Sequence, residues 1–504
     1  MSAQPLVPPL PDPNDMLPIS TWAKGRVDLP RHAAYWFTKA HPERERLARK
    51  AKHLAAPSLG RASLAALART GGRVLTTVGP AGLAEIFQTA TDVRRAKDGK
   101  ELKNPDVDAR KVAIEHAQRL VEAGGPAYVK LGQFIASAKG LLPDEWVEAF
   151  AWCRDEVPPL KEGVAESIIK HVFERPVDEI FASFDPTPIG SASIAQVHAA
   201  TLHDGTEVVV KVRRPGLRKQ FSTDIRVMAL LASVAERLVP EARMGNLSGF
   251  VELFAQIVLE ELDFRLEAVN IMELGLASES AGHDYANFPR PIADLVAANV
   301  LVMERVPGVR YTDAMERYPG KLDGDKLLRL AITSVLEHTL IFGRFHGDLH
   351  AGNVFIDETG KFSLVDFGIV GRLTADQRAA LIRFMIGFAS DDVGAQLYAM
   401  REFGAVPPDA DMDALIATVQ VEADKLSQIT DIRVGQISQG LDELADAMGK
   451  VLRALARSGF VLPKELVIFF KNLLYLNGFA AALAPDVNLL AEIEPIFTYF
   501  ATKY

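Results

Sequence analysis

Apolar residues along most of the chain recur at helical spacing. This pattern predicts helices over about 109–123 and 126–139, and a longer helix over about 325–342. Residues 401–504 also have helical spacing, with breaks at prolines. Helix is therefore the predominant predicted element at both ends of the chain.

Strands are predicted in the middle of the chain. Residues 193–199 are rich in Ile, Val and Ala, and 207–212 form a second apolar run. Asp204-Gly205 between them is a typical hairpin turn, and residues 299–304 predict a further strand. Strands, a helix, a strand and then a helix leading into a polar loop predict an α+β fold with two lobes.

The length of 504 residues suits two or three domains. We expect a proline-rich arm with basic helices over 1–108, the recognisable chemistry over 109–400, and a helical region over 401–504. A single cysteine, Cys153, excludes an internal disulfide and fits a reducing compartment. We expect it to be a small buried hydrophobic residue.

Charge is unevenly distributed. The net charge is −9, but residues 1–110 contain 18 Lys and Arg against 11 Asp and Glu, an excess of +7. The basic stretch 44–73 has the spacing of a helix, and suits either docking on anionic lipid or a solvated helix face. Nucleic acid is not an expected partner, because the overall balance is acidic and basic residues do not alternate with aromatic ones.

No segment meets the length expected of a membrane span. The best candidate, between Lys471 and Asp486, has 14 uncharged residues, whereas a span needs roughly 20. The N-terminus also lacks the basic and then apolar pattern of a signal peptide. These features predict a cytoplasmic protein, with peripheral binding to the inner membrane as an alternative.

The most informative run is His346-Gly-Asp-Leu-His-Ala-Gly-Asn353, which is followed by Asp366-Phe367-Gly368. An Asp, an Asn five residues later and a downstream Asp-Phe-Gly are what phosphoryl transfer from ATP requires. Asp348 would orient the acceptor hydroxyl. Asn353 and Asp366 would hold Mg²⁺ on the phosphates. The spacing predicts kinase-like chemistry.

Lys211 lies within the apolar strand 207–212, where a charge is costly to bury without an anionic partner. We interpret it as a phosphate-binding lysine held by a helical carboxylate, with a strand-edge lysine reaching solvent as the alternative. Glu267 is the expected partner. Lys211, Glu267 and Asp348 form the predicted catalytic set.

The phosphate loop is unusual, because no G-x-G and no Walker A motif occurs in the chain. In the expected place stands Gly190-Ser191-Ala192-Ser193, whose small side chains still let backbone N–H groups approach phosphates. Met303 and Glu304, at the end of a predicted strand, complete the nucleotide-binding set.

The segment after Gly368 is short. Thr374-Ala-Asp-Gln377 has the pattern of a capping box and opens a helix almost at once, which leaves little room for a peptide-binding platform. His350 stands two residues after Asp348, where protein serine kinases often have lysine. Both features favour an atypical or small-molecule kinase. His346 and His350 could suggest a metal pair, but structural hydrogen bonding is the better interpretation.

With these motifs, the chain resembles the UbiB family of atypical kinases, also called the ABC1 or ADCK family. The distinguishing mark is a K-x-G-Q motif, Lys130-Leu131-Gly132-Gln133, after Gly124-Gly125-Pro126. The resemblance implies a protein-kinase-like fold with a K-x-G-Q extension over 109–160, an N-lobe over 161–306 and a C-lobe over 307–400.

The resemblance also implies a gated site. Lys130 and Gln133 would meet an E-x-D pair, Glu261 and Asp263, across the active site. Residues 190–193 would correspond to the family's alanine-rich nucleotide loop, but they lack its three alanines, which leaves the preference for ATP or ADP open. Such a site implies Mg²⁺-dependent ATP binding and hydrolysis rather than protein phosphorylation.

The family supports isoprenoid quinone or lipid metabolism, often at membranes, which implies a lipid or quinone-precursor ligand and a peripheral anionic membrane as partners. The paired C-terminal membrane helices of some bacterial members are missing, which weakens transfer of the quinone role. Two other functions stay open: a small-molecule phosphotransferase of the aminoglycoside or choline kinase type, and a nucleotide-gated scaffold. The oligomeric state is left open.

Overall fold

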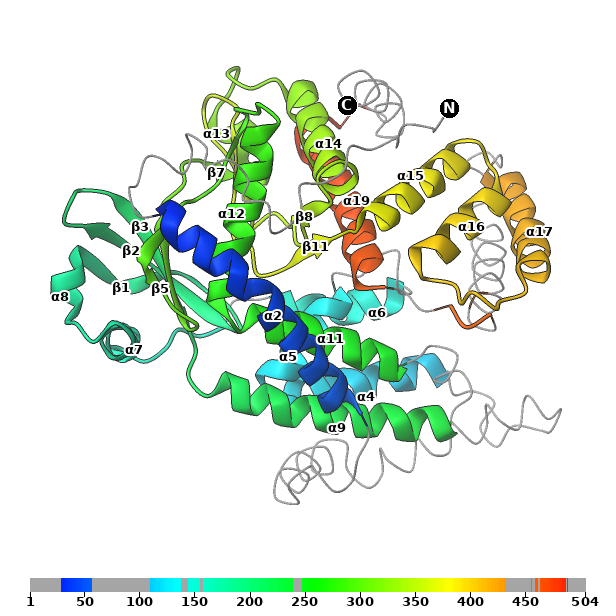
Figure 1. Cartoon of the computed structure of the whole chain (residues 1–504), viewed down its shortest axis with the longest axis horizontal. Coiled ribbons are helices and arrows are strands. Elements are labelled where there is room, and N and C mark those ends of the chain that lie inside the picture. The colour runs from blue at the N-terminus through cyan, green and yellow to red at the C-terminus, as the bar shows by residue number, and fades with distance from the viewer. Residues whose placement is uncertain are drawn as a thin grey trace.

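A computed structural model describes residues 29–56, 109–136, 144–154, 157–238, 247–430, 455, 458–460, 463–485 and 487. Within these residues, the predicted two-lobed α+β arrangement is present (Figure 1). A five-stranded sheet with its helices forms one lobe. Helices with short strands form the other.

The first lobe contains an antiparallel sheet in the order β1-β2-β3-β6-β5. Its strands are β1 (Phe181–Ser191), β2 (Ala195–Leu202), β3 (Glu207–Arg213), β5 (Pro291–Val296) and β6 (Val300–Glu304). The predicted hairpin turn joins β2 to β3, where Gly205 has φ 83° and Asp204 accepts a hydrogen bond from the Thr206 amide. The hairpin places Lys211 in the middle of the sheet.

The two faces of β3 have different surroundings. Val208, Val210 and Val212 are fully buried in a core cluster that also contains Ile169, on the short helix α7 (Val164–Phe173). Lys211 lies at an alternate position, on the opposite face of the strand. Strand alternation therefore turns the lysine away from the apolar core.

Helices build the rest of this lobe. They are α2 (Leu29–Ala55), α4 (Ala109–Gly124), α5 (Pro126–Ala136), α6 (Asp144–Ala149), the 3₁₀-helix η1 (Ala151–Arg154), α8 (Val177–Ile180), α9 (Leu217–Leu238), α11 (Leu247–Glu261) and α12 (Phe264–Ser280). The early helix α2 runs across α11 and α12 (Figure 1), and its Leu47 and Leu54 belong to their core. Residues 29–55 thus pack as part of this lobe, while most of 1–108 lies outside the described residues.

The second lobe contains two small sheets: four strands in the order β4-β10-β9-β7, and the pair β8 and β11. The strands are β4 (Ala286–Asn287), β7 (Val309–Arg310), β8 (Arg344–His346), β9 (Val354–Ile356), β10 (Phe362–Leu364) and β11 (Val370–Arg372). The helices are α13 (Tyr311–Arg317), α14 (Gly324–Leu340), α15 (Ala375–Ala389), α16 (Val393–Phe403), α17 (Met412–Thr430) and α19 (Lys464–Leu483). Strands β8 and β9 flank the loop that contains Asp348.

Helix α19 corrects the expectation about membrane spans. Among the described residues it is the one helix long and apolar enough to qualify, by length and composition only. The expected segment was too short because it was limited to the 14 uncharged residues after Lys471, whereas the helix begins at Lys464 and has 20 residues. Phe469, Leu476 and Phe479 are buried in the core of the second lobe. Its apolar character is that of a core helix.

Candidate active site

Lys211 joins the two lobes at the centre of the site. Its Nζ donates to Glu267 Oε1 at 2.8 Å and to Asp366 Oδ1 at 2.8 Å. Glu267 lies on α12 and Asp366 follows β10, so three separate segments meet at one ammonium group. The ion pair predicted between Lys211 and Glu267 forms, and the fold adds Asp366 to it.

Burial and charge together set the protonation of this group. Burial disfavours the ammonium of Lys211, but Asp366 and Glu267 outweigh it and raise the pKa of Lys211 above its ordinary value. Burial also opposes ionisation of Asp366, yet Lys211 lowers the pKa of Asp366 to about 2. Burial raises the pKa of Glu267 to about 7, because Lys211 offsets it only in part and the negative charge of Asp366 adds to it. Lys211 and Asp366 are therefore both charged at neutral pH.

The backbone around Asp366 is held in an uncommon conformation. Asp366 has φ 59°, in the left-handed region that residues other than glycine rarely adopt. The next residue, Phe367, donates its amide to Glu267 Oε1 at 3.2 Å and accepts from Asn270 Nδ2 at 2.6 Å. The fully buried Phe367 ring anchors the turn. Together these contacts direct the Asp366 carboxylate toward Lys211.

Two histidines shape the catalytic loop. His346 Nδ1 accepts the Asp348 amide at 3.1 Å, and burial lowers the pKa of His346 to about 4, so its ring is neutral. His350 Nδ1 accepts the Gly352 amide at 3.0 Å. Asn353 Nδ2 donates to the Asp348 carbonyl at 3.0 Å and ties the two ends of the run together. These contacts support the interpretation of the histidines as structural residues.

Three residues of α19 reach the catalytic loop, and no sequence motif predicted a role for them. Lys471 Nζ and Tyr475 Oη both donate to Asp348 Oδ1, at 2.8 Å and 3.0 Å. Asn472 Nδ2 donates to the carbonyl of His346. No motif connects these positions to Asp348, because 123 residues separate Lys471 from it. The sequence hint of a role was Lys471 itself, a charged residue inside the largely apolar helix α19.

The predicted gate is present in part. Lys130 Nζ on α5 donates to Glu261 Oε1 at 2.6 Å. Gln133, however, accepts from Ser193 Oγ at 3.3 Å, in the predicted nucleotide loop. Asp263 instead caps α12 and pairs with Arg265 at 2.6 Å. The expectation that Lys130 and Gln133 both meet the E-x-D pair therefore holds for Lys130 alone, because the N-terminus of α12 and Arg265 occupy the Asp263 carboxylate.

Gly132 of the K-x-G-Q motif has a packing role. A Cβ at this position would overlap the Sγ of Cys153 on η1. Cys153 is buried, as predicted. The glycine therefore permits α5 to approach η1 closely, and Lys130 and Gln133 are placed by that approach.

The predicted nucleotide loop begins inside strand β1, which contains Gly190 and Ser191, and one arginine holds the segment in place. Arg214 donates to the Ala192 carbonyl at 2.9 Å and to Ser191 Oγ at 2.8 Å. A Cβ on Gly190 would meet open space, so no described atom crowds that side of the strand. No sequence motif pointed to Arg214.

Met303 and Glu304, the other predicted nucleotide-binding residues, lie at the end of β6. Met303 is buried in the core beside Val209. Glu304 accepts from Arg290 Nε at 2.6 Å. Their side chains are thus engaged within the protein, and the Glu304 amide also donates to the Arg290 carbonyl at 3.0 Å.

The donor set fits Mg²⁺ held together with a nucleotide. Within the described residues, Asn353 Oδ1 and Asp366 Oδ2 accept no hydrogen bond that would compete, and buried Glu267 Oε2 has no partner either. No group of three or more His, Cys, Asp or Glu side chains in the described part could hold an ion by itself. Mg²⁺ commonly takes one or two protein oxygens and completes its shell with water and phosphate. The residues present fit that arrangement.

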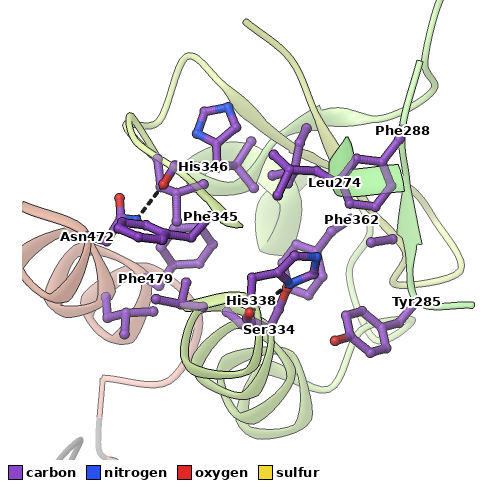
Figure 2. Close-up of a pocket in the computed structure, with 17 residues that line it drawn as sticks. Leu274, Tyr285, Phe288, Ser334, His338, Phe345, His346, Phe362, Asn472 and Phe479 are labelled. Carbon is purple, nitrogen blue, oxygen red and sulfur yellow. Dashed lines mark hydrogen bonds between the residues drawn. The ribbon is translucent and has the colours of Figure 1, made fainter. Parts of the chain in front are cut away.

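A separate apolar cavity lies behind the catalytic loop, between α12, α14 and α19 (Figure 2). Phe288, Phe362 and Phe479 line it, and His338 and His346 are among its few polar lining residues. It holds about 50 Å³, well below the roughly 300–1,000 Å³ of ligand sites. The cavity is therefore distinct from the cluster around Lys211 and too small for a nucleotide.

Comparison with known proteins gives consistent matches. A model of the ABC1 atypical kinase-like domain matches residues 153–398. An uncharacterized protein of Mycobacterium tuberculosis is 34% identical over 78% of each chain. An uncharacterized chloroplastic aarF domain-containing protein kinase of Arabidopsis thaliana is 31% identical over 75% of this chain and 73% of that protein. A probable protein kinase UbiB of Marinobacter nauticus is 31% identical over 76% of this chain and 69% of that protein.

Proposed function

The chain belongs to the ABC1/UbiB family of atypical kinases, and from this premise we propose that it binds Mg-ATP and hydrolyses or transfers its γ-phosphoryl group. Membership supports an ATP-using, kinase-like phosphotransferase. The observation that carries the proposal is Lys211, 2.8 Å from both Glu267 and Asp366, with Asn353 bonded to the loop of Asp348. These are the parts that phosphoryl transfer needs.

Each residue has a task that follows from its surroundings. Lys211 is charged and would bind phosphate oxygens, while Glu267 fixes its position. Asn353 and Asp366 would hold Mg²⁺, which when bound neutralises negative charge on the phosphoryl oxygens. Asp348 is ionised and would accept a hydrogen bond from the attacking hydroxyl or water and so orient it.

The contacts of α5 favour water or a small acceptor over a protein. Lys130 ties α5 to Glu261, and Gln133 ties it to Ser193 of the predicted nucleotide loop. A helix fixed at both points covers the site that a protein segment would have to enter. This supports ATP hydrolysis or transfer to a small hydroxyl compound.

We further infer a role in isoprenoid quinone or lipid metabolism at an anionic membrane surface, with a lipid or quinone precursor as the ligand. The similarity to UbiB supports the metabolic role. The exposed Arg49 and Lys52 on α2 support membrane contact. Arg44 does not contribute to this surface, because it donates to Asn270 at 2.8 Å in the interior.

The test is ADP release from Mg-ATP by the purified protein, with and without anionic liposomes. We expect Asp366→Asn to lose at least about 100-fold in turnover, because it removes the charge that would hold Mg²⁺. Asp376→Asn, at an exposed carboxylate in the first turn of α15, is the control and should match the wild type. Unchanged turnover in Asp366→Asn would refute the site. Turnover only with an added alcohol would favour a small-molecule phosphotransferase.

A further inference from the structure

The catalytic loop contains no permanent cation. Residues 346–353 include no Lys or Arg. His350 stands where protein serine kinases often have lysine, and its Nδ1 is occupied by the Gly352 amide. Its Nε2 lies 3.9 Å from Asp348 Oδ2, beyond hydrogen-bonding distance. A kinase-like reaction at Asp348 would therefore need a positive charge from elsewhere.

Helix α19 provides that charge. Lys471 Nζ is 2.8 Å from Asp348 Oδ1, and the two side chains are 10% and 22% exposed. Tyr475, one helical turn further along, donates to the same oxygen at 3.0 Å. Partial burial limits screening by solvent and salt. One carboxylate oxygen is thus held by two donors from a single helix face.

Rigid packing holds these donors in place. Asn472 donates to the carbonyl of His346, which fixes α19 to the start of the catalytic loop (Figure 2). Leu466 and Phe469 are fully buried on the same helix, which packs on α14. Lys471 therefore sits on a helix that the core positions, rather than on a freely moving segment.

We propose that Lys471 is a positioning residue for phosphoryl chemistry at Asp348, an inference that rests on the proposed function. The lysine holds Asp348 Oδ1 and leaves Oδ2 to receive the acceptor hydroxyl or water. It supplies from α19 the cation that protein serine kinases often have within the catalytic loop. The reaction at Asp348 depends on this contact because a small misplacement of a reacting group costs rate.

The experiment measures kcat and nucleotide affinity separately. Lys471→Met should lower kcat for Mg-ATP hydrolysis about 10- to 100-fold, while the Kd of a fluorescent ADP analogue changes by less than about twofold because Lys211 is untouched. Lys471→Arg should recover most of kcat, since it restores the cation. A structural defect would instead change Kd, kcat and Tm together.

Lys464→Met is the matched control. Lys464 lies on the same helix, is 9% exposed, and donates to a buried carboxylate, Glu260, at the same 2.8 Å. Glu260 has no place in the proposed site. Loss of this ion pair should lower Tm by as much as Lys471→Met does, and should leave kcat within about threefold of wild type, the range of a remote substitution.

Other outcomes overturn the inference. Equal kcat in Lys471→Met and wild type would mean that the lysine does not act on the reaction. A higher kcat would mean that it blocks Asp348, and an equal loss in Lys464→Met would indicate a purely structural effect. If wild type turns over ATP and Asp366→Asn does not, such results remove only the role of Lys471. A wild type without turnover overturns the proposed function and this inference with it.

Discussion

Two lysines reach the site from opposite ends of the chain, and both lie outside the segment matched by the ABC1 model. Lys130 on α5 is 2.6 Å from Glu261, and Lys471 on α19 is 2.8 Å from Asp348. The two pairs have nearly the same length, and both are largely buried. Their carboxylates nevertheless respond in opposite directions.

The pKa of Glu261 is raised and that of Asp348 is lowered. Burial raises both, but Lys130 does not fully offset it at Glu261, where the negative charge of Asp366 also acts. At Asp348, Lys471 and then His350 outweigh burial. An ion pair of given length therefore does not set protonation by itself, because the neighbouring charges decide it. Lys130 makes a covering contact, and Lys471 holds an ionised reactive carboxylate.

The largest expected effect is a difference in kcat between variants of the two carboxylates, Asp348 and Glu261. Asp348→Asn should lower kcat for Mg-ATP hydrolysis by at least about 100-fold, because it removes the group that orients the attacking oxygen. Glu261→Gln should change kcat by less than about tenfold, since Gln keeps a hydrogen-bond acceptor for Lys130. Steady-state kinetics under saturating Mg-ATP checks both. Equal losses would show that the covering contact is itself part of the reaction.

The second prediction concerns the packing of α5, the helix that contains Lys130. Gly132→Ala should reduce the free energy of unfolding by about 1–3 kcal/mol, because the new methyl group overlaps Cys153. Gly478→Ala on α19 is the comparison, since its Cβ would lie 3.1 Å from the Tyr311 hydroxyl. Alanine favours helix by about 1 kcal/mol over glycine, so that variant should be near neutral. Urea denaturation measures both, and an unaffected Gly132→Ala would contradict the close packing of α5.

The third prediction concerns pH. The folded pKa of Asp348 lies below its ordinary 3.8, so its contribution to stability is present above pH 3.8 and is lost as pH falls further. The folded pKa of Glu261 lies above its ordinary 4.5, so its contribution is present below pH 4.5 and is lost as pH rises through the folded value. A pKa that differs by one between the folded and unfolded protein changes the free energy of unfolding by about 1.4 kcal/mol.

Urea denaturation at several pH values should therefore show a shallower acid loss of stability in Lys471→Met than in wild type. Glu261→Gln should differ from wild type on the other side of the pH range, with a smaller loss between pH 4.5 and neutrality. Parallel curves for all three proteins would be inconsistent with the opposite pKa changes of the two carboxylates.

The smallest effect is expected for Tyr475→Phe. Removal of one hydrogen bond to Asp348, with Lys471 still in place, should cost about 1 kcal/mol, or about fivefold in kcat. Tyr398→Phe, at an exposed tyrosine on α16, is the control and should be silent. A loss as large as that of Lys471→Met would move the main positioning role to the tyrosine.

Sequence motifs predicted well the part of the site around Lys211. Lys211 stands in a strand whose alternation is visible, and Glu267 lies in a short acidic helix segment, so their pairing was expected. The capping box at Thr374 and Gln377 is also present. The capping box depends on neighbours in sequence, whereas the Lys211–Glu267 pair spans 56 residues and was expected from the kinase-like order of the motifs. The expected contact of Gln133 with the E-x-D pair is not made, because Gln133 accepts from Ser193 and Asp263 is used by the start of α12 and by Arg265.

By itself, the sequence determined the element order, the two-lobed fold and the residue types that kinase-like chemistry requires. These follow from periodicity and short spacings, which act within one element or between adjacent ones. Only the tertiary structure decided that α19 belongs at the catalytic loop, with Lys471 on Asp348. The physical reason is that burial of the apolar residues of α19 against α14 selects the position of this helix. Apolar burial is non-directional and does not depend on how far apart two segments are in the sequence, so no local motif reveals it.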